Sequence, residues 1–126
     1  MTANDYQKKA HGFVSGGASN CAYPFLGLAE EAGEVLGKVA KYIRKHYVWP
    51  SDAQGALHWR DGGYRDFKED VKVLSDISKE LGDCMWMIAE ICTKMGFSLE
   101  RVMERNIRKL EGRRERGTIV GEGDER

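Results

Sequence analysis

Residues 24–46 read PFLGLAEEAGEVLGKVAKYIRKH, and the spacing of their apolar side chains decides the fold. These side chains recur at helical intervals, at Leu28, Ala32, Val35, Val39 and Ile43. Such a period is typical of an amphipathic α-helix. Pro24 suits the first turn of that helix, because a residue there needs no backbone N–H donor. The stretch therefore predicts one long helix over residues 24–46.

Similar patterns predict three further helices. We expect a short helix at residues 3–13 and a long one from about Phe67 to Met95, ended by Gly96 in a left-handed cap. Ser98 is placed as the N-cap of the last helix, which stops at Gly117. No strong strand pattern appears. The predicted fold class is all-α, an antiparallel helix bundle.

The chain has 126 residues, which predicts a single domain over residues 1–126. Residues 47–66 interrupt the helical pattern as a loop insertion with four aromatic residues, Tyr47, Trp49, Trp59 and Tyr64. These side chains either pack the insertion down or stack on a nucleotide base. Residues 118–126 are Gly-rich and acidic, and we expect an irregular tail there.

Charge and composition exclude several classes of protein. The 20 basic and 20 acidic residues give a formal net charge of zero, which argues against a nucleic-acid partner. No apolar run approaches the ~20 residues that span a bilayer, and the N-terminus lacks the order of a signal peptide. The three cysteines, Cys21, Cys84 and Cys92, have no zinc-type spacing. We therefore expect a cytoplasmic protein with no membrane partner.

Two of the predicted helices carry nearly the same local sequence. Residues 28–35 read LAEEAGEV and residues 77–84 read ISKELGDC, so both follow the pattern aliphatic-x-x-Glu-apolar-Gly-acid-apolar. In each helix one acid borders the apolar stripe, and a second acid three residues later lies on the same flank. The four acids placed in this way are Glu31, Glu34, Glu80 and Asp83. Glu30 points away from the stripe.

Packing of the two stripes on each other brings the four carboxylates to one edge of the seam. Clustered carboxylates repel and raise one another's pKa, and a divalent cation removes that conflict. An all-oxygen set of ligands suits Mg²⁺ or Mn²⁺. Gly33 and Gly82 leave space beside the acids. The competing interpretation is that these acids are solvated charges on helix faces.

The two acidic motifs resemble those of the MazG-like, all-α nucleoside triphosphate pyrophosphohydrolases, in which Glu-Glu-x-x-Glu on one helix is followed by Glu-x-x-Asp on the next. The resemblance covers about residues 24–117. It extends to Asn106, Lys109, Arg113 and Arg116, where relatives place an Asn and basic residues that face the phosphates. The ending at residues 116–124 looks like that of short phage-type or bacterial-type members. The 45 residues between Glu34 and Glu80 exceed the usual separation.

The resemblance implies the chemistry and the site. Mg²⁺, or Mn²⁺ as a substitute, is expected at Glu31, Glu34, Glu80 and Asp83, where it binds a nucleoside triphosphate and activates a water that attacks the α-phosphorus. Glu30 or Glu31 is expected to assist as the base. Asn106, Lys109, Arg113 and Arg116 are the expected substrate-binding residues. The products are monophosphate and pyrophosphate, and the protein is expected to be a homodimer or homotetramer.

Two other classes of function remain open on the sequence. The first is a helical interaction module whose acids and bases form intermolecular salt bridges. The second is a nucleic-acid-binding protein that uses the basic stretch at residues 101–116. Neither alternative requires release of pyrophosphate in the presence of Mg²⁺, which separates both from the enzyme.

Overall fold

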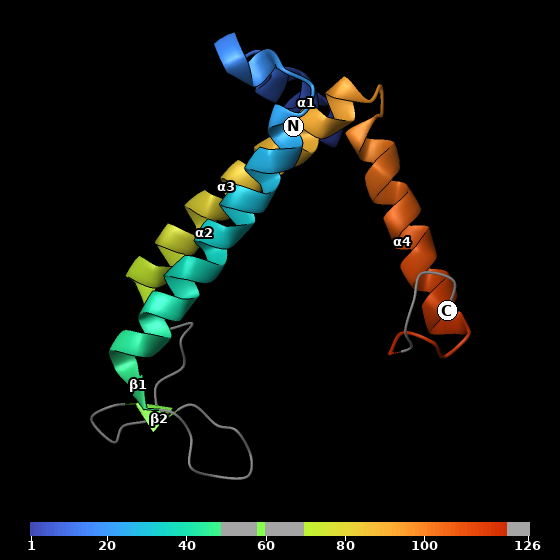
Figure 1. Ribbon diagram of the computed structural model, residues 1–126. Coiled ribbons are helices and arrows are strands. Elements are labelled where there is room, and N and C mark those ends of the chain that lie inside the picture. The colour runs from blue at the N-terminus through green and yellow to red at the C-terminus, as the bar shows by residue number, and fades with distance from the viewer. Residues whose placement is uncertain (49–57, 60–69, 121–126) are drawn as a thin grey trace. The chain divides into compact units, whose positions relative to one another are not determined.

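The computed structural model describes residues 1–48, 58–59 and 70–120 (Figure 1). The described residues form four α-helices, one short 3-10 helix and one two-stranded ladder. In chain order the elements are α1 (Ala3–His11), η1 (Gly16–Ser19), α2 (Tyr23–His46), β1 (Tyr47–Val48), β2 (His58–Trp59), α3 (Val71–Lys94) and α4 (Leu99–Glu115). The predicted all-α fold class is therefore confirmed.

The ends of the helices follow the predicted caps. Gly96 has a φ of 70°, and the N–H of Phe97 donates to the carbonyl of Cys92 at 2.7 Å, so α3 ends in a left-handed cap. Ser98 then caps α4, because its hydroxyl accepts a hydrogen bond from the N–H of Arg101. Gly117 has a φ of 68°, so α4 also ends in a left-handed cap.

The aromatic insertion begins with structure that the sequence pattern does not predict. The two strands β1 and β2 pair antiparallel, with Tyr47 opposite Trp59 and Val48 opposite His58. Two-residue strands are too short to show the alternation by which a strand is recognised, so this ladder was missed. Trp49 and Tyr64 lie outside the described residues, as does the start of the long helix predicted at Phe67.

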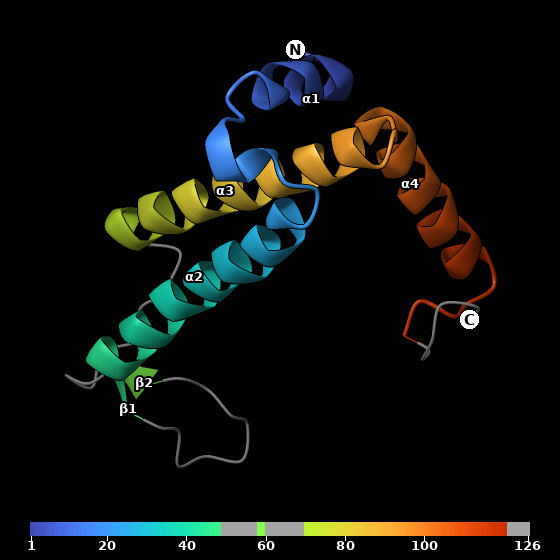
Figure 2. The same cartoon turned by 45° about the horizontal axis from the view of Figure 1, so that its top comes forward.

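The chain divides into two compact units, Met1–Cys21 with Ala89–Arg126, and Ala22–Ile88. In the second unit α2 and α3 run antiparallel and approach closely where Gly27 meets Met87 (Figure 2). A Cβ placed on Gly27 would lie 2.7 Å from the Sδ atom of Met87, whose side chain is buried. An alanine at position 27 would therefore force the buried Met87 side chain to shift.

Part of the predicted apolar stripe is not covered in this unit. Ala32 is exposed, and Leu81 is 50% exposed. The expectation that Ala32 lies within a packed seam is therefore wrong for this unit. A pair of helices can bury only one face of each partner, so residues at the flank of a broad stripe stay in water.

In the first unit, α1 holds the turn between α3 and α4 through one amide side chain. The Gln7 amide nitrogen donates to the carbonyl of Phe97 at 2.8 Å and to the hydroxyl of Thr93 at 3.2 Å. The Gln7 amide oxygen accepts from the N–H of Leu99 at 2.8 Å. These bonds satisfy backbone groups that the ends of helices leave without partners. No helix among the described residues has the length and hydrophobicity needed to cross a membrane.

Candidate metal centre

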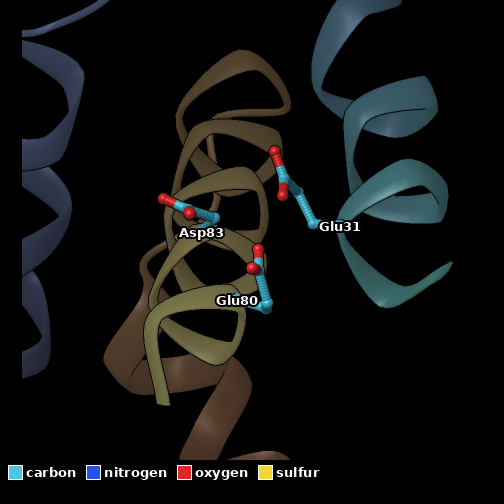
Figure 3. A group of neighbouring side chains, drawn as sticks. All are labelled: Glu31, Glu80 and Asp83. Atoms are coloured by element: carbon cyan, nitrogen blue, oxygen red, sulfur yellow. The ribbon is translucent and has the colours of Figure 1, made fainter. Parts of the chain in front are cut away.

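The candidate metal centre lies in the second unit, where α2 and α3 face each other. Glu31 comes from α2, and Glu80 and Asp83 come from α3 at a spacing of three residues. Each of the three offers a carboxylate oxygen, and these oxygens all lie within 4.8 Å of one another. Figure 3 shows Glu31 reaching from its helix toward the two acids of α3. Residues 49 positions apart in the chain thus form one acidic cluster, which we call the acidic triad.

Glu34, the fourth predicted ligand, is not in this group of converging oxygens. Its side chain is exposed on α2, three residues after Glu31, and its charge still acts on Glu31. Glu30 is also exposed and also acts on Glu31 through its charge. Both residues therefore contribute to the potential of the site, and their roles as ligand and as base remain predictions.

The electrostatics of the triad centre on Glu31. Desolvation raises the pKa of this carboxyl above its usual value of 4.5, and the charges of Asp83 and Glu34 raise it further. Desolvation likewise raises the pKa of the Cys84 thiol, with a contribution from Glu31. A protonated thiol is not a metal ligand, so the ligands that the centre offers are carboxylate oxygens. The site is thus a partly buried, strongly negative cluster that stores unfavourable repulsion.

A lysine that the sequence analysis did not single out pairs with this cluster. The ammonium of Lys38 lies 3.0 Å from Oε1 of Glu80. The hydrogen bond to Glu80 and the charge of that carboxylate raise the pKa of Lys38 above its ordinary 10.5, so the ammonium of Lys38 keeps its proton at neutral pH. Lys38 follows Glu31 by seven residues and therefore lies on the same face of α2. That spacing puts Lys38 on the side of the acids but does not by itself identify Glu80 as its partner.

The three acids fit a hard divalent cation. Their oxygens are close enough to meet at one ion, and carboxylate oxygen is the ligand type that Mg²⁺ and Mn²⁺ prefer. Their mutual repulsion is unfavourable, and a bound cation removes it. A Cβ placed on Gly33 or Gly82 meets no described atom within 4 Å, so the space predicted beside the acids is open.

The predicted substrate-binding residues all lie on α4 or at its end, in the first unit. Asn106, Lys109 and Arg116 are exposed, as a residue that meets a soluble ligand must be. Arg113 is only 5% exposed, and its backbone carbonyl accepts from the N–H of Thr118 at 2.8 Å. Their contact with phosphate remains a prediction.

The fold and the site define an all-α protein with a carboxylate centre suited to a divalent cation. Residues 24–118 match the MazG nucleotide pyrophosphohydrolase domain. The Gene 37 protein of Mycobacterium phage L5 is 34% identical over 116 residues, covering 87% of this chain and 85% of the phage protein. No solved structure matches the chain. The chain therefore belongs to the MazG nucleotide pyrophosphohydrolase family, as its two acidic motifs predict.

Membership supports a nucleotide pyrophosphohydrolase activity for this chain, and a nucleotide as its substrate. The family is typically dependent on a divalent metal ion, which agrees with the acidic triad.

Proposed function

We propose that this protein hydrolyses nucleoside triphosphates, either deoxynucleotides or modified nucleotides, to a monophosphate and pyrophosphate in a Mg²⁺-dependent reaction. The observation that carries the proposal is the convergence of Glu31, Glu80 and Asp83 from two helices. A single acidic motif on one helix is a common solvated surface, whereas oxygens that converge from both helices within 4.8 Å form a group able to hold a metal ion. Membership in the family supplies the reaction class.

The reaction adds the oxygen of water to the α-phosphorus and breaks the bond from that phosphorus to the oxygen bridging to the β-phosphorus. Pyrophosphate leaves with the bridging oxygen, and the proton of the water passes to a base. Mg²⁺, when bound, supplies charge neutralisation for the phosphates and increases the acidity of water. We propose that Glu31 or Glu30 accepts this proton, since the two acids are neighbours on α2.

Glu34 is proposed to complete the set of metal ligands with the acidic triad. Its position three residues after Glu31 puts both acids on one flank of α2. A rotation of the exposed Glu34 side chain brings its carboxylate toward the ion once the repulsion is neutralised. On α4 we propose Lys109 and Asn106 as the first contacts to the phosphates, with Arg116 beside them. Arg113 would need to leave its buried position to join them.

The protein is further proposed to be a homodimer, with a homotetramer as the larger alternative. The support is an apolar face on α4 that the rest of the first unit leaves exposed. Its residues are Val102, Met103, Ile107 and Leu110, which are between 39% and 53% exposed. Burial of such a face against a second copy is favourable by roughly 25 cal/mol per Å². Light scattering at micromolar concentration that gives the mass of one chain overturns this part of the proposal.

The activity is tested with a panel of canonical and modified nucleoside triphosphates in Mg²⁺, scored for pyrophosphate against orthophosphate. The expected result is pyrophosphate from at least one substrate, lost on chelation of the metal and in Glu80→Gln. Release of diphosphate and orthophosphate contradicts the proposed reaction. No turnover with any member of the panel leaves the helical interaction module as the better interpretation.

A further inference from the structure

The short helix α1 makes a row of polar contacts along one of its faces. Asn4, Gln7 and His11 are spaced by three and four residues, so their side chains lie on the same face of α1. We call these three residues the polar stripe. Their partners lie at residues 90–100, at the end of α3, in the turn that follows it and at the start of α4. All of these contacts belong to the first unit.

Two residues of the polar stripe cap the start of α4 from another helix. The first N–H groups of a helix have no partner within that helix. The N–H of Leu99 donates to the amide oxygen of Gln7 at 2.8 Å, and the N–H of Glu100 donates to the amide oxygen of Asn4 at 3.3 Å. The N-cap of α4 itself serves the third N–H group, at 3.3 Å. The start of α4 is therefore fixed as much by α1 as by its own cap.

The same two amides are also bound at their nitrogen atoms. The amide nitrogen of Gln7 donates to the carbonyl of Phe97, and the amide nitrogen of Asn4 donates to the Glu100 carboxylate at 2.8 Å. The hydroxyl of Ser98 donates to the amide oxygen of Asn4 at 2.9 Å. Because both ends of each amide are engaged, the position of α1 and the conformation of the turn depend on each other.

The place of α1 depends on these polar contacts. A helix of nine residues is not stable by itself in water. Ala10 is buried, and the polar stripe ends at His11, whose Nδ1 lies 2.9 Å from Oε2 of the buried Glu90. The helix α1 also lies outside residues 24–118, which match the family domain. It is thus an addition to that domain that holds the α3–α4 turn through hydrogen bonds.

The turn held by α1 is the start of the helix that carries the proposed phosphate contacts. Asn106 and Lys109 follow Leu99 by seven and ten residues on α4, a length over which a helix is stiff. The bonds at its start therefore decide where Asn106 and Lys109 lie relative to the end of α3. We propose that α1 positions α4 for the substrate, with Asn4 and Gln7 as positioning residues. The proposal rests on the proposed function and adds to it residues that control substrate affinity without touching the substrate.

The first measurement is amide hydrogen exchange read by NMR. Gln7→Ala should speed exchange at Leu99 about tenfold, because the N–H of Leu99 loses its acceptor. Exchange at Thr118, which is bonded at the far end of α4, should stay as in the wild type. Lys8→Ala is the matched control, since it removes an exposed side chain from the same helix and should change neither rate.

The second measurement separates KM from kcat for the best substrate of the nucleotide panel. Gln7→Ala and Asn4→Ala should each raise KM about fivefold and leave kcat unchanged, as expected when binding alone is weakened. Gln7→Glu keeps an acceptor for Leu99, so its KM should lie nearer to that of the wild type. Cys92→Ala removes a buried side chain from the same unit without touching the caps. This variant should lower the melting temperature and leave KM unchanged.

Wild-type exchange at Leu99 in Gln7→Ala overturns the proposal, whether or not the protein is active. Faster exchange with an unchanged KM overturns the role of α1 in substrate binding. An equal rise of KM in Cys92→Ala overturns it too, because the effect is then only that of lower stability. A wild type that splits no nucleotide refutes the proposed function, and faster exchange at Leu99 then still supports the hold of α1 on α4.

Discussion

The ammonium of Lys38 on α2 lies 3.0 Å from the Glu80 carboxylate on α3, and so one member of the acidic triad is held by a cation of the protein itself. Glu80 therefore differs from Glu31, which has no cation within ion-pair distance among the described residues. The two acids belong to one cluster, but removal of the charge should stabilise the metal-free protein only at Glu31. This difference gives the first test of the cluster.

In metal-free protein, Glu31→Gln should raise the melting temperature by about 1–3 °C, because the variant loses repulsion and no attractive partner. Glu80→Gln should give no such gain, since it removes the ion pair with Lys38 together with the repulsion. Thermal melts in a chelator compare the two variants with the wild type. A lower melting temperature for Glu31→Gln than for the wild type means that the acids do not repel one another.

The pH dependence of stability follows from the raised pKa of Glu31. Below pH 4.5 the carboxyl is protonated in the folded and the unfolded state, and its desolvation imposes no penalty. As the pH rises above that value the unfolded chain loses the proton first, so the free energy of unfolding falls until the folded protein is also ionised. Urea unfolding of metal-free protein from pH 4.5 to neutral pH checks this. The difference between wild type and Glu31→Gln should widen with pH, and a constant difference contradicts the account.

Mg²⁺ should stabilise the folded protein, because the acidic triad exists only when α2 and α3 are packed. At a concentration one hundred times the Kd the free energy of unfolding should rise by about 2.7 kcal/mol, and it should grow with the logarithm of concentration beyond that. Differential scanning calorimetry across a Mg²⁺ series measures this. The gain should be much smaller in Asp83→Asn, and an equal gain in that variant places the bound ion elsewhere.

The close approach of the two helices at Gly27 gives a prediction about packing. Gly27→Ala should destabilise the protein by about 1–3 kcal/mol, because the new Cβ meets the buried Met87. Gly37→Ala is the matched control on the same helix, where a Cβ meets no described atom within 4 Å. This control should stabilise by about 0.4–1 kcal/mol through the entropy of the unfolded chain. Equal effects of the two substitutions in urea unfolding contradict the close contact.

The helices could be predicted from the sequence because their ends are fixed locally. Pro24, Gly96, Ser98 and Gly117 act through their own backbone conformation or a hydrogen bond three residues away, which a linear pattern records. The β1–β2 ladder joins residues ten to twelve positions apart and lacks such a local signal. Burial at the edge of the stripe was also beyond the pattern, since Leu81 depends on how many helices cover its face.

The meeting of Glu31, Glu80 and Asp83 could be predicted because two amphipathic stripes that pack together carry their flanking acids with them. The partner of Glu80 could not be predicted in the same way. Lys38 is one of three lysines on α2, and only the register between α2 and α3 decides which of them reaches the acid. The helical period decides on which face of its helix a residue lies. The register between two helices is fixed by close contacts such as that of Gly27 with Met87.

The central claim is that water attacks the α-phosphorus at the carboxylate centre. The most direct measurement is the fate of oxygen-18 when a substrate is hydrolysed in labelled water with Mg²⁺ and the products are read by phosphorus NMR. The label should enter only the monophosphate, pyrophosphate should leave unlabelled, and Glu80→Gln should form neither product. Label in the pyrophosphate, or release of orthophosphate, would contradict it.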